Sequence, residues 1–255
     1  MTNPEVILQT SIEKGVGKIG KPWLAKWLLG FVGGAMIALG FLADIRVSAA
    51  IPASGGSTLI GASVFPIGLI VILLAGGELV TGNMMAVSTA AFAKRIRWGA
   101  FWQNLALITV ANLIGAIAVA FCFGHFVGLT HTGVFKTAVI TMAQGKIQAS
   151  FWQSLVSGIG CNWFVGLAVW LSFGAKDAAG KIMGVWFPIM IFVATGFQHS
   201  IANAFLIPAA IFEGGATWSQ FALNLLPVYL GNIIGGAIFV GALYYYSYRQ
   251  ALKVS

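Results

Sequence analysis

Residues 77–83 read GELVTGN, and residues 197–203, 120 positions further along the chain, read FQHSIAN. Asn83 and Asn203 end the two segments, and Glu78 of the first aligns with Gln198 of the second. The same shift pairs further identical residues: Trp98 with Trp218, Phe101 with Phe221, Asn104 with Asn224, Leu105 with Leu225, Asn112 with Asn232, Ile114 with Ile234 and Gly115 with Gly235. Such a repeat in an apolar chain is typical of transporters and channels whose site lies between the two halves.

The composition is that of a membrane protein. Of the 255 residues, 59% are hydrophobic and 8% are charged, and a soluble domain of this size would lack the polar residues to cover itself. Runs long enough to cross a bilayer occur at residues 23–43, 59–81, 105–127, 151–173, 183–211 and 223–246. The sequence therefore predicts an all-α protein of six transmembrane helices. Glycines interrupt the second and fifth runs, so we expect these two helices to be broken.

Lysine and arginine are distributed unevenly about these runs. Eleven of the 14 lie in the leader, in the loops after the second and fourth runs or in the tail, and the other three are Arg46, Lys136 and Lys146. Cytoplasmic segments carry the excess of positive charge, so we expect both termini in the cytoplasm and the protein in the plasma (inner) membrane. The net charge of +8 is then a topology signal and requires no nucleic-acid partner.

The repeats, at about residues 23–127 and 151–246, contain three runs each. Three is odd, so the second repeat must be inverted relative to the first, with a pseudo-two-fold axis in the membrane plane. Residues 1–22 are expected to form a cytoplasmic leader with an amphipathic helix, residues 23–246 the channel domain, and residues 247–255 a cytoplasmic tail.

Polar side chains at membrane depth are costly unless they are paired or line a pathway. For Asn104, Asn112, Asn224 and Asn232 we expect a structural role, in which they hold the third and sixth helices to the broken ones. Glu78, with Asn83, is expected to be structural as well, its carboxylate capping exposed backbone N–H groups at the break.

His199 stands out among the polar residues. It combines membrane depth, an adjacent break and alignment with the break of the other repeat, and its ordinary pKa near 6.5 allows proton exchange with a weak acid. Lys146 is open to two interpretations, either a solvated loop lysine or a cation that concentrates anions at a pore mouth.

The other candidates for metal or redox chemistry are expected to be inert. Cys122 and Cys161 lie within apolar runs, where packing is their ordinary role. His125 and His131 are expected to be solvated near the outer end of the third run, badly placed for a metal or haem site. We therefore expect no metal, no cofactor and no enzyme activity.

Three segments carry a resemblance that covers nearly the whole chain: GGELVTGN (residues 76–83), CNWFVGLAVW (residues 161–170) and GFQHSIANAFLIP (residues 196–208). They resemble the formate/nitrite transporter family, the HSIAN segment being the most distinctive. The family has an aquaporin-like fold, although this chain lacks paired Asn-Pro-Ala motifs, and its only Asn-Pro is Asn3-Pro4. The resemblance implies homopentamers in which each protomer has its own pore for a small monovalent anion.

The resemblance also assigns roles to single residues. It implies that His199 is the central histidine, with Asn203 and Asn162 as polar partners and Thr81 in the loop of the broken second helix. Further roles that it implies are apolar constrictions at Phe65 and Phe192 on the outer side and at Leu69 and Leu79 on the inner side, and a vestibule lysine at Lys146.

One residue departs from the family pattern, which usually has glutamate where Gln198 stands. An amide can hydrogen-bond but cannot relay a proton, so a permanently cationic His199 becomes less favourable. The expected function is formate conduction, as the protonated acid or with a proton, because loss of hydration favours the neutral acid. Nitrite, hydrosulfide, acetate and lactate remain alternatives. Other classes are an aquaporin-like neutral-solute channel and a membrane enzyme or quinone-binding subunit.

Overall fold

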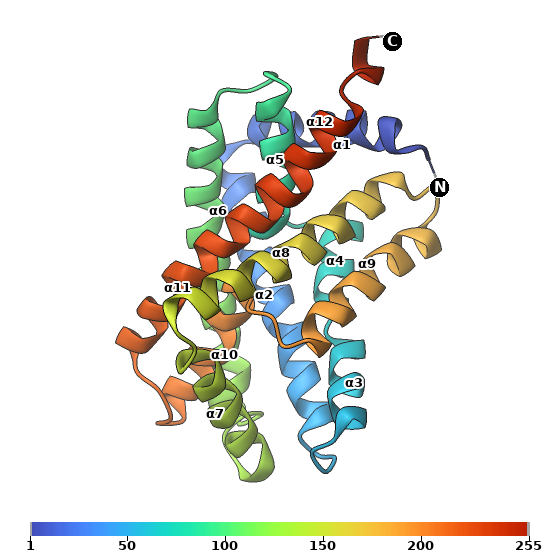
Figure 1. Cartoon of the computed structure of the whole chain (residues 1–255). Helices are drawn as coiled ribbons and strands as arrows, with labels where there is room; N and C mark the ends of the chain where they lie inside the picture. Colours follow the sequence, from blue (N-terminus) through green and yellow to red (C-terminus); the bar gives the residue numbers. More distant parts are fainter. Residues whose placement is uncertain (1, 254–255) are drawn as a thin grey trace.

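The computed structural model describes residues 2–253, within which every regular element is a helix (Figure 1). The helices are α1 (Pro4–Gly20), α2 (Trp23–Ser48), α3 (Gly55–Val64), α4 (Ile67–Leu74), α5 (Val80–Phe92), α6 (Trp98–Val119), η1 (Ala120–Phe126), α7 (Gly133–Ile147), α8 (Phe151–Gly174), α9 (Ala178–Ala194), α10 (Ser200–Phe212), α11 (Trp218–Ile233), η2 (Ile234–Ala242), α12 (Leu243–Tyr248) and η3 (Ala251–Lys253).

Within residues 2–253, five apolar helical stretches are long enough to cross a membrane: Trp23–Ser48, Gly55–Leu74, Trp98–Phe126, Phe151–Gly174 and Trp218–Tyr248. The expected fifth run is divided between two shorter apolar helices, α9 and α10. The expected second run, residues 59–81, needs correction. Its helix begins at Gly55 and stops at Leu74, and Thr81 belongs to the next helix, α5. Both ends of the chain lie at the same end of the bundle (Figure 1).

The chain breaks in the same way before α5 and before α10. Gly76 and Gly196 stand at equivalent positions and both have positive φ, +107° and +75°, a conformation that favours glycine because a Cβ would be strained there. The residues preceding the two helices then adopt nearly the same extended conformation, with φ −112° and ψ 125° at Leu79, and φ −111° and ψ 123° at His199. Both predicted interruptions are therefore present.

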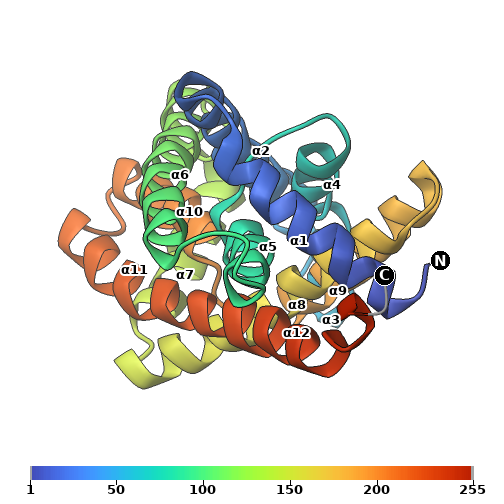
Figure 2. The same cartoon turned by 90° about the horizontal axis from the view of Figure 1, so that it is seen from above.

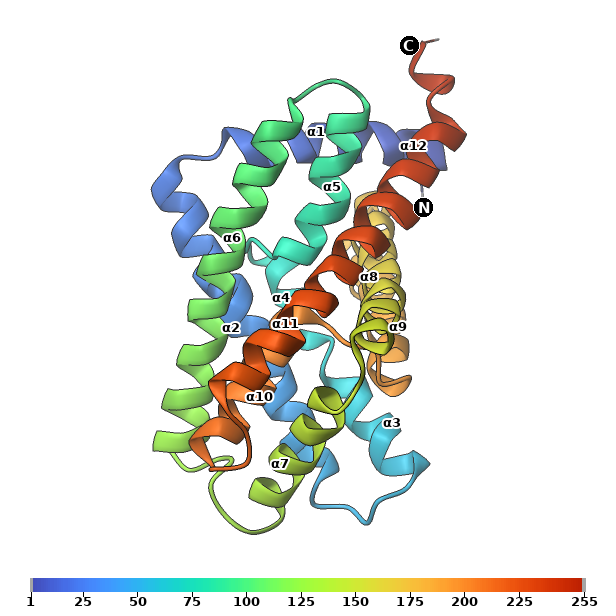
Figure 3. The ribbon, with the colours of Figure 1, turned by 60° about the vertical axis from the view of Figure 1, so that its left-hand side comes forward.

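Glycines let the long helices pack backbone to backbone. A Cβ on Gly34 of α2 would collide with the carbonyl of Asn112 in α6, and one on Gly235 of η2 with the carbonyl of Ile159 in α8. Figure 3 shows α2 beside α6 and α11 beside α8 along much of their length. Small residues permit close approach of this kind between membrane helices.

Helix α1 lies across the end of the bundle at which both termini are found (Figure 2). It buries Ile7, Leu8 and Ile12 in a small apolar cluster with residues of α5 and α8. This is the amphipathic helix expected of the leader, and its packing brings the lysines of its C-terminal half towards the first break.

Candidate functional site

The first break is held by three asparagine side chains. Asn112 Oδ1 accepts from the backbone N–H of Val80 at 2.9 Å, and its Nδ2 donates to the carbonyls of Gly30 and Glu78 at 2.6 and 2.8 Å. Asn83 Nδ2 donates to Glu78 Oε2 and to Asn104 Oδ1, both at 2.9 Å. The polar backbone that the break exposes is thereby satisfied inside an apolar protein.

The second break repeats this framework. Asn232 Oδ1 accepts from the backbone N–H of Ser200 at 2.9 Å, and its Nδ2 donates to the carbonyls of Gly158 and Gln198 at 2.9 and 3.2 Å. Asn203 Nδ2 donates to Gln198 Oε1 at 2.8 Å and to Asn224 Oδ1 at 2.9 Å. The structural role expected of the four paired asparagines is confirmed.

The two breaks meet at Thr81 and His199. Thr81 Oγ1 lies 3.0 Å from His199 Nε2, and both residues are buried. His199 Nδ1 accepts from the backbone N–H of Ala202 at 3.0 Å, so the neutral imidazole carries its proton on Nε2 and presents it to the Thr81 hydroxyl. Asn162 lies close by and donates to the Thr81 carbonyl at 3.2 Å.

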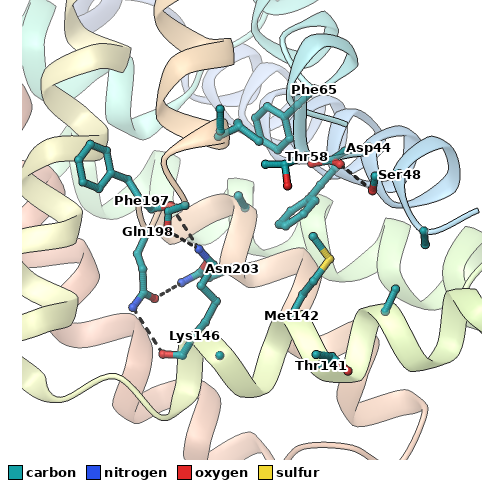
Figure 4. Close-up of a pocket in the computed structure, with 18 of the residues that line it drawn as sticks. Asp44, Ser48, Thr58, Phe65, Thr141, Met142, Lys146, Phe197, Gln198 and Asn203 are labelled. Atoms are coloured by element: carbon teal, nitrogen blue, oxygen red, sulfur yellow. Dashed lines mark hydrogen bonds between the residues drawn. The ribbon is translucent and has the colours of Figure 1, made fainter. Parts of the chain in front are cut away.

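A cavity of about 1270 Å³ opens on one side of this contact. We call it the Lys146 cavity; its lining includes Lys146, Asp44 and Phe65 (Figure 4). His199 and Phe192 line it as well. The two phenyl rings are perpendicular, with centroids 5.6 Å apart, and the ring of Phe192 stacks on that of His199 at 6.0 Å. Aromatic side chains thus line the wall of this cavity beside the histidine.

Lys146 is tied to the second break. Its Nζ donates to the carbonyl of Gly196 at 2.7 Å, and its own carbonyl accepts from Asn224 Nδ2 at 3.0 Å. Burial lowers the pKa of its ammonium, and within residues 2–253 no carboxylate lies within 4.0 Å of it. The positive charge is therefore fixed at the cavity wall without a directly paired acid.

A second cavity, of about 540 Å³, lies at the end of the bundle that carries the termini. We call it the Glu78 cavity; Leu69 and Leu79 line it together with Glu78 and Lys18. Lys18 Nζ lies 2.8 Å from Glu78 Oε2, and Lys21 Nζ lies 3.9 Å from Oε1. An ion pair between Lys18 and Glu78 therefore links helix α1 to the first break, and both residues line this cavity.

Comparison with known proteins identifies the type of protein. A family model described as formate/nitrite transporter matches residues 5–246. The chain belongs to this family. It is 55% identical over 249 residues to an uncharacterized transporter, YrhG, of Bacillus subtilis, with 97% of this chain and 94% of the relative covered. It is 49% identical to the formate channel BtFdhC of Bacillus thuringiensis, with 97% and 96% covered.

A solved structure agrees with this assignment. It is described as a pentameric formate channel with formate bound, and it matches with a TM-score of 0.77 and 29% identity, over 89% of this chain and 98% of the other. The protein is accordingly a multi-pass membrane transporter with the fold of this family, and it is not an enzyme.

Most side chains predicted for the pathway of this transporter lie around the two breaks. Four of them, His199, Asn203, Gln198 and Lys146, line the Lys146 cavity, whereas Thr81 and Asn162 lie buried beside it. The expectation for Glu78 needs correction. Its carboxylate accepts from the side chains of Lys18 and Asn83 instead of from backbone N–H groups, and at this break the backbone N–H of Val80 is bound by Asn112.

Two buried acids of this transporter were missed. Asp44 lines the Lys146 cavity and accepts from Ser48 at 3.2 Å, while Glu213 faces His125 and His131 at 3.1 and 2.8 Å. Each lies one or two residues beyond the expected end of a span, at 43 and 211, and neither was among the predicted site residues. The two histidines, expected to be solvated and badly placed for a metal, are in fact gathered around one carboxylate.

Proposed function

We propose that this transporter conducts formate in its neutral, protonated form through a pathway that crosses the Thr81–His199 contact. The observation that carries the proposal is the position of this buried pair. The Lys146 cavity opens beside it and the Glu78 cavity lies towards the end of the bundle that carries the termini, and the linings of both cavities contain lysine and apolar side chains. Similarity to formate channels supports formate as the substrate.

Lys146 has the role of concentrating the anion. A fixed positive charge in a cavity with low-dielectric walls raises the local concentration of anions and the rate at which they enter. The same charge stabilises the ionised form of formate, so Lys146 gathers the substrate without promoting its protonation. Protonation therefore occurs deeper in the pathway, where formate loses its hydration.

His199 acts as a neutral hydrogen-bond donor in this mechanism. Protonating Nδ1 would break its bond from the Ala202 N–H, and loss of the Nε2 proton would produce an unstable imidazolate. His199 thus holds the Thr81 hydroxyl oxygen and leaves the Thr81 proton free to donate to a formate oxygen. The proton that converts formate to formic acid comes from water in the Lys146 cavity.

The apolar side chains provide selectivity. Phe65 and Phe192 on one side, and Leu69 and Leu79 on the other, disfavour hydrated ions by size and dewetting. Transfer of an ion into such a zone costs on the order of 20 kcal/mol in the idealised limit, a penalty that a neutral acid avoids. Nitrite, hydrosulfide and short monocarboxylates satisfy the same requirements and are the alternative substrates; an aquaporin-like solute channel is the alternative class.

The proposal includes an arrangement in the membrane. The two repeats form inverted halves about a pseudo-two-fold axis, α9 and α10 together form a sixth span, and five protomers assemble with one pore each. Both termini, including the leader at residues 1–22 and the tail at residues 247–255, face the cytoplasm. The matching frameworks of the two breaks support the inverted repeat, and the pentameric relative supports the assembly.

Flux measurements in liposomes test the proposed function. The purified protein is reconstituted with an internal pH dye, and formate, nitrite, acetate and chloride gradients are applied between pH 5 and pH 8. The expected result is formate flux accompanied by proton movement and well above that of protein-free liposomes. Formate flux equal to that of the empty liposomes would overturn the proposal, and water or glycerol permeation in its place would favour the aquaporin-like alternative.

A further inference from the structure

A cluster of metal-binding side chains lies away from the pathway, where η1, the loop at residues 127–132 and α7 meet the end of α10. Figure 3 shows the lower end of α6, which η1 continues, near α7 at the end of the molecule opposite the termini. His125 of η1, His131 of the loop and Glu213 after α10 each offer one ligand atom, and these atoms lie within 4.8 Å of one another.

We infer that His125, His131 and Glu213 form a binding site for one Zn²⁺ ion. Two imidazoles and one carboxylate are a ligand set that zinc uses in proteins, usually with water in the fourth position. In the structure, His125 Nδ1 lies 3.1 Å from Glu213 Oε1, and His131 Nδ1 lies 2.8 Å from Oε2. The ion would replace the protons that the two Nδ1 atoms donate to the carboxylate.

The geometry requires little rearrangement. Zinc bonds to nitrogen and oxygen measure about 2.0–2.2 Å, so ligand atoms of a tetrahedral site lie about 3.4 Å apart. The two imidazole rings, whose centroids are 5.4 Å apart, would each have to move by roughly 1 Å or less. Surface access is also present, because the side chain of His131 is 52% exposed, whereas that of Glu213 is fully buried.

The C-terminal end of α10 favours a cation at Glu213, whereas the neighbouring basic side chains oppose one. Glu213 is the C-cap residue that directly follows α10, and the C-terminus of a helix carries partial negative charge. Opposing this, Lys136 Nζ lies 4.0 Å from Glu213 Oε2, and Arg46 donates to the carbonyl of Leu129 in the same loop. The competition predicts that removing Lys136 strengthens metal binding.

Zinc binding to the whole purified protein tests the inference. Untagged protein carrying Cys122→Ser, which removes an exposed thiol, is freed of metal and titrated with Zn²⁺ against a chromophoric chelator at pH 7.5. We expect one ion per protomer. Affinity should fall at least tenfold in His131→Asn and about a hundredfold in His125→Asn/His131→Asn, and rise about threefold in Lys136→Met.

Two results would overturn the site. One is the absence of a bound ion in the Cys122→Ser protein, and the other is equal zinc binding by His131→Asn. Because the His131 side chain is largely exposed, that variant is expected to fold normally, which its thermal unfolding without metal verifies. Retention of zinc by the double variant would likewise exclude these histidines, and the cluster would then be a hydrogen-bonded brace between η1, the loop and α10.

Discussion

At the first break the carboxylate of Glu78 accepts from Lys18 and Asn83, whereas at the second break the amide of Gln198 occupies the aligned position and accepts from Asn203 and Asn224. The other asparagines bind equivalent groups at the two breaks, but Asn224 Nδ2 also donates to the carbonyl of Lys146. The lysines differ accordingly, because Lys18 is paired with an acid and Lys146 donates only to backbone carbonyls. The breaks therefore share their structure and differ in the electrostatic potential that they present to an anion.

The largest effect is expected on stability, when the asparagine framework shared by the two breaks is removed. Asn112→Leu and Asn232→Leu each remove three hydrogen bonds to buried backbone groups. Each substitution should lower the free energy of unfolding by about 3 kcal/mol or more. Thermal unfolding in detergent provides the measurement, with the exposed Gln103→Leu as the control that stays near the original stability. A large loss at one break and none at the other would contradict the equivalence.

The second prediction concerns the charge of Lys146 and its effect on formate flux. Lys146→Met should reduce formate flux about tenfold at low formate and low salt, and the deficit should shrink as salt screens the charge. Burial lowers the pKa of Lys146, so its positive charge is lost at a lower pH than that of an exposed lysine. The formate fluxes of Lys146→Met and of the original protein should therefore converge as the pH is raised into the alkaline range. Exposed Lys176→Met is the control. A deficit that is independent of salt would show that Lys146 acts through structure instead.

The third prediction changes the charge at each break and concerns the half-saturating formate concentration. Gln198→Glu adds an acid beside the Lys146 cavity and should raise the half-saturating formate concentration about threefold at low salt. Glu78→Gln removes the acid paired with Lys18 and should lower the half-saturating formate concentration by a similar factor. Gln148→Glu, which adds the same charge outside the cavity, is the control. Shifts of both variants in the same direction would mean that local charge does not set anion entry.

The smallest effect on formate flux is expected for substitution of Asp44. It is the acid that lines the Lys146 cavity, so Asp44→Asn should raise formate flux about twofold at neutral pH by removing a charge that repels the anion. Ser48→Ala removes the hydrogen bond to this carboxylate and keeps its charge, so it should change the flux less. A lower flux in Asp44→Asn would contradict a repulsive role.

Much of the fold follows from the sequence because its main signals are local. Apolar runs mark the membrane helices, and glycines such as Gly76 and Gly196 mark the breaks. Span ends were predicted less well, since α2 continues to Ser48 and the second crossing stops at Leu74. The first of these errors hid Asp44. Contacts such as Lys18 with Glu78, or His131 with Glu213, join residues 60 and 82 positions apart and depend on packing that no local pattern encodes.

Proton-coupled formate flux through His199→Phe tests the central proposal most directly. Phenylalanine preserves the ring packed against Phe192 but cannot hydrogen-bond to Thr81 or to the Ala202 N–H. The variant and the original protein are reconstituted at equal amounts, and formate and proton movement are recorded together from pH 5 to pH 8. We expect a folded protein whose pH-coupled formate flux is lost. Unchanged formate and proton flux at every pH would show that the substrate does not depend on this histidine.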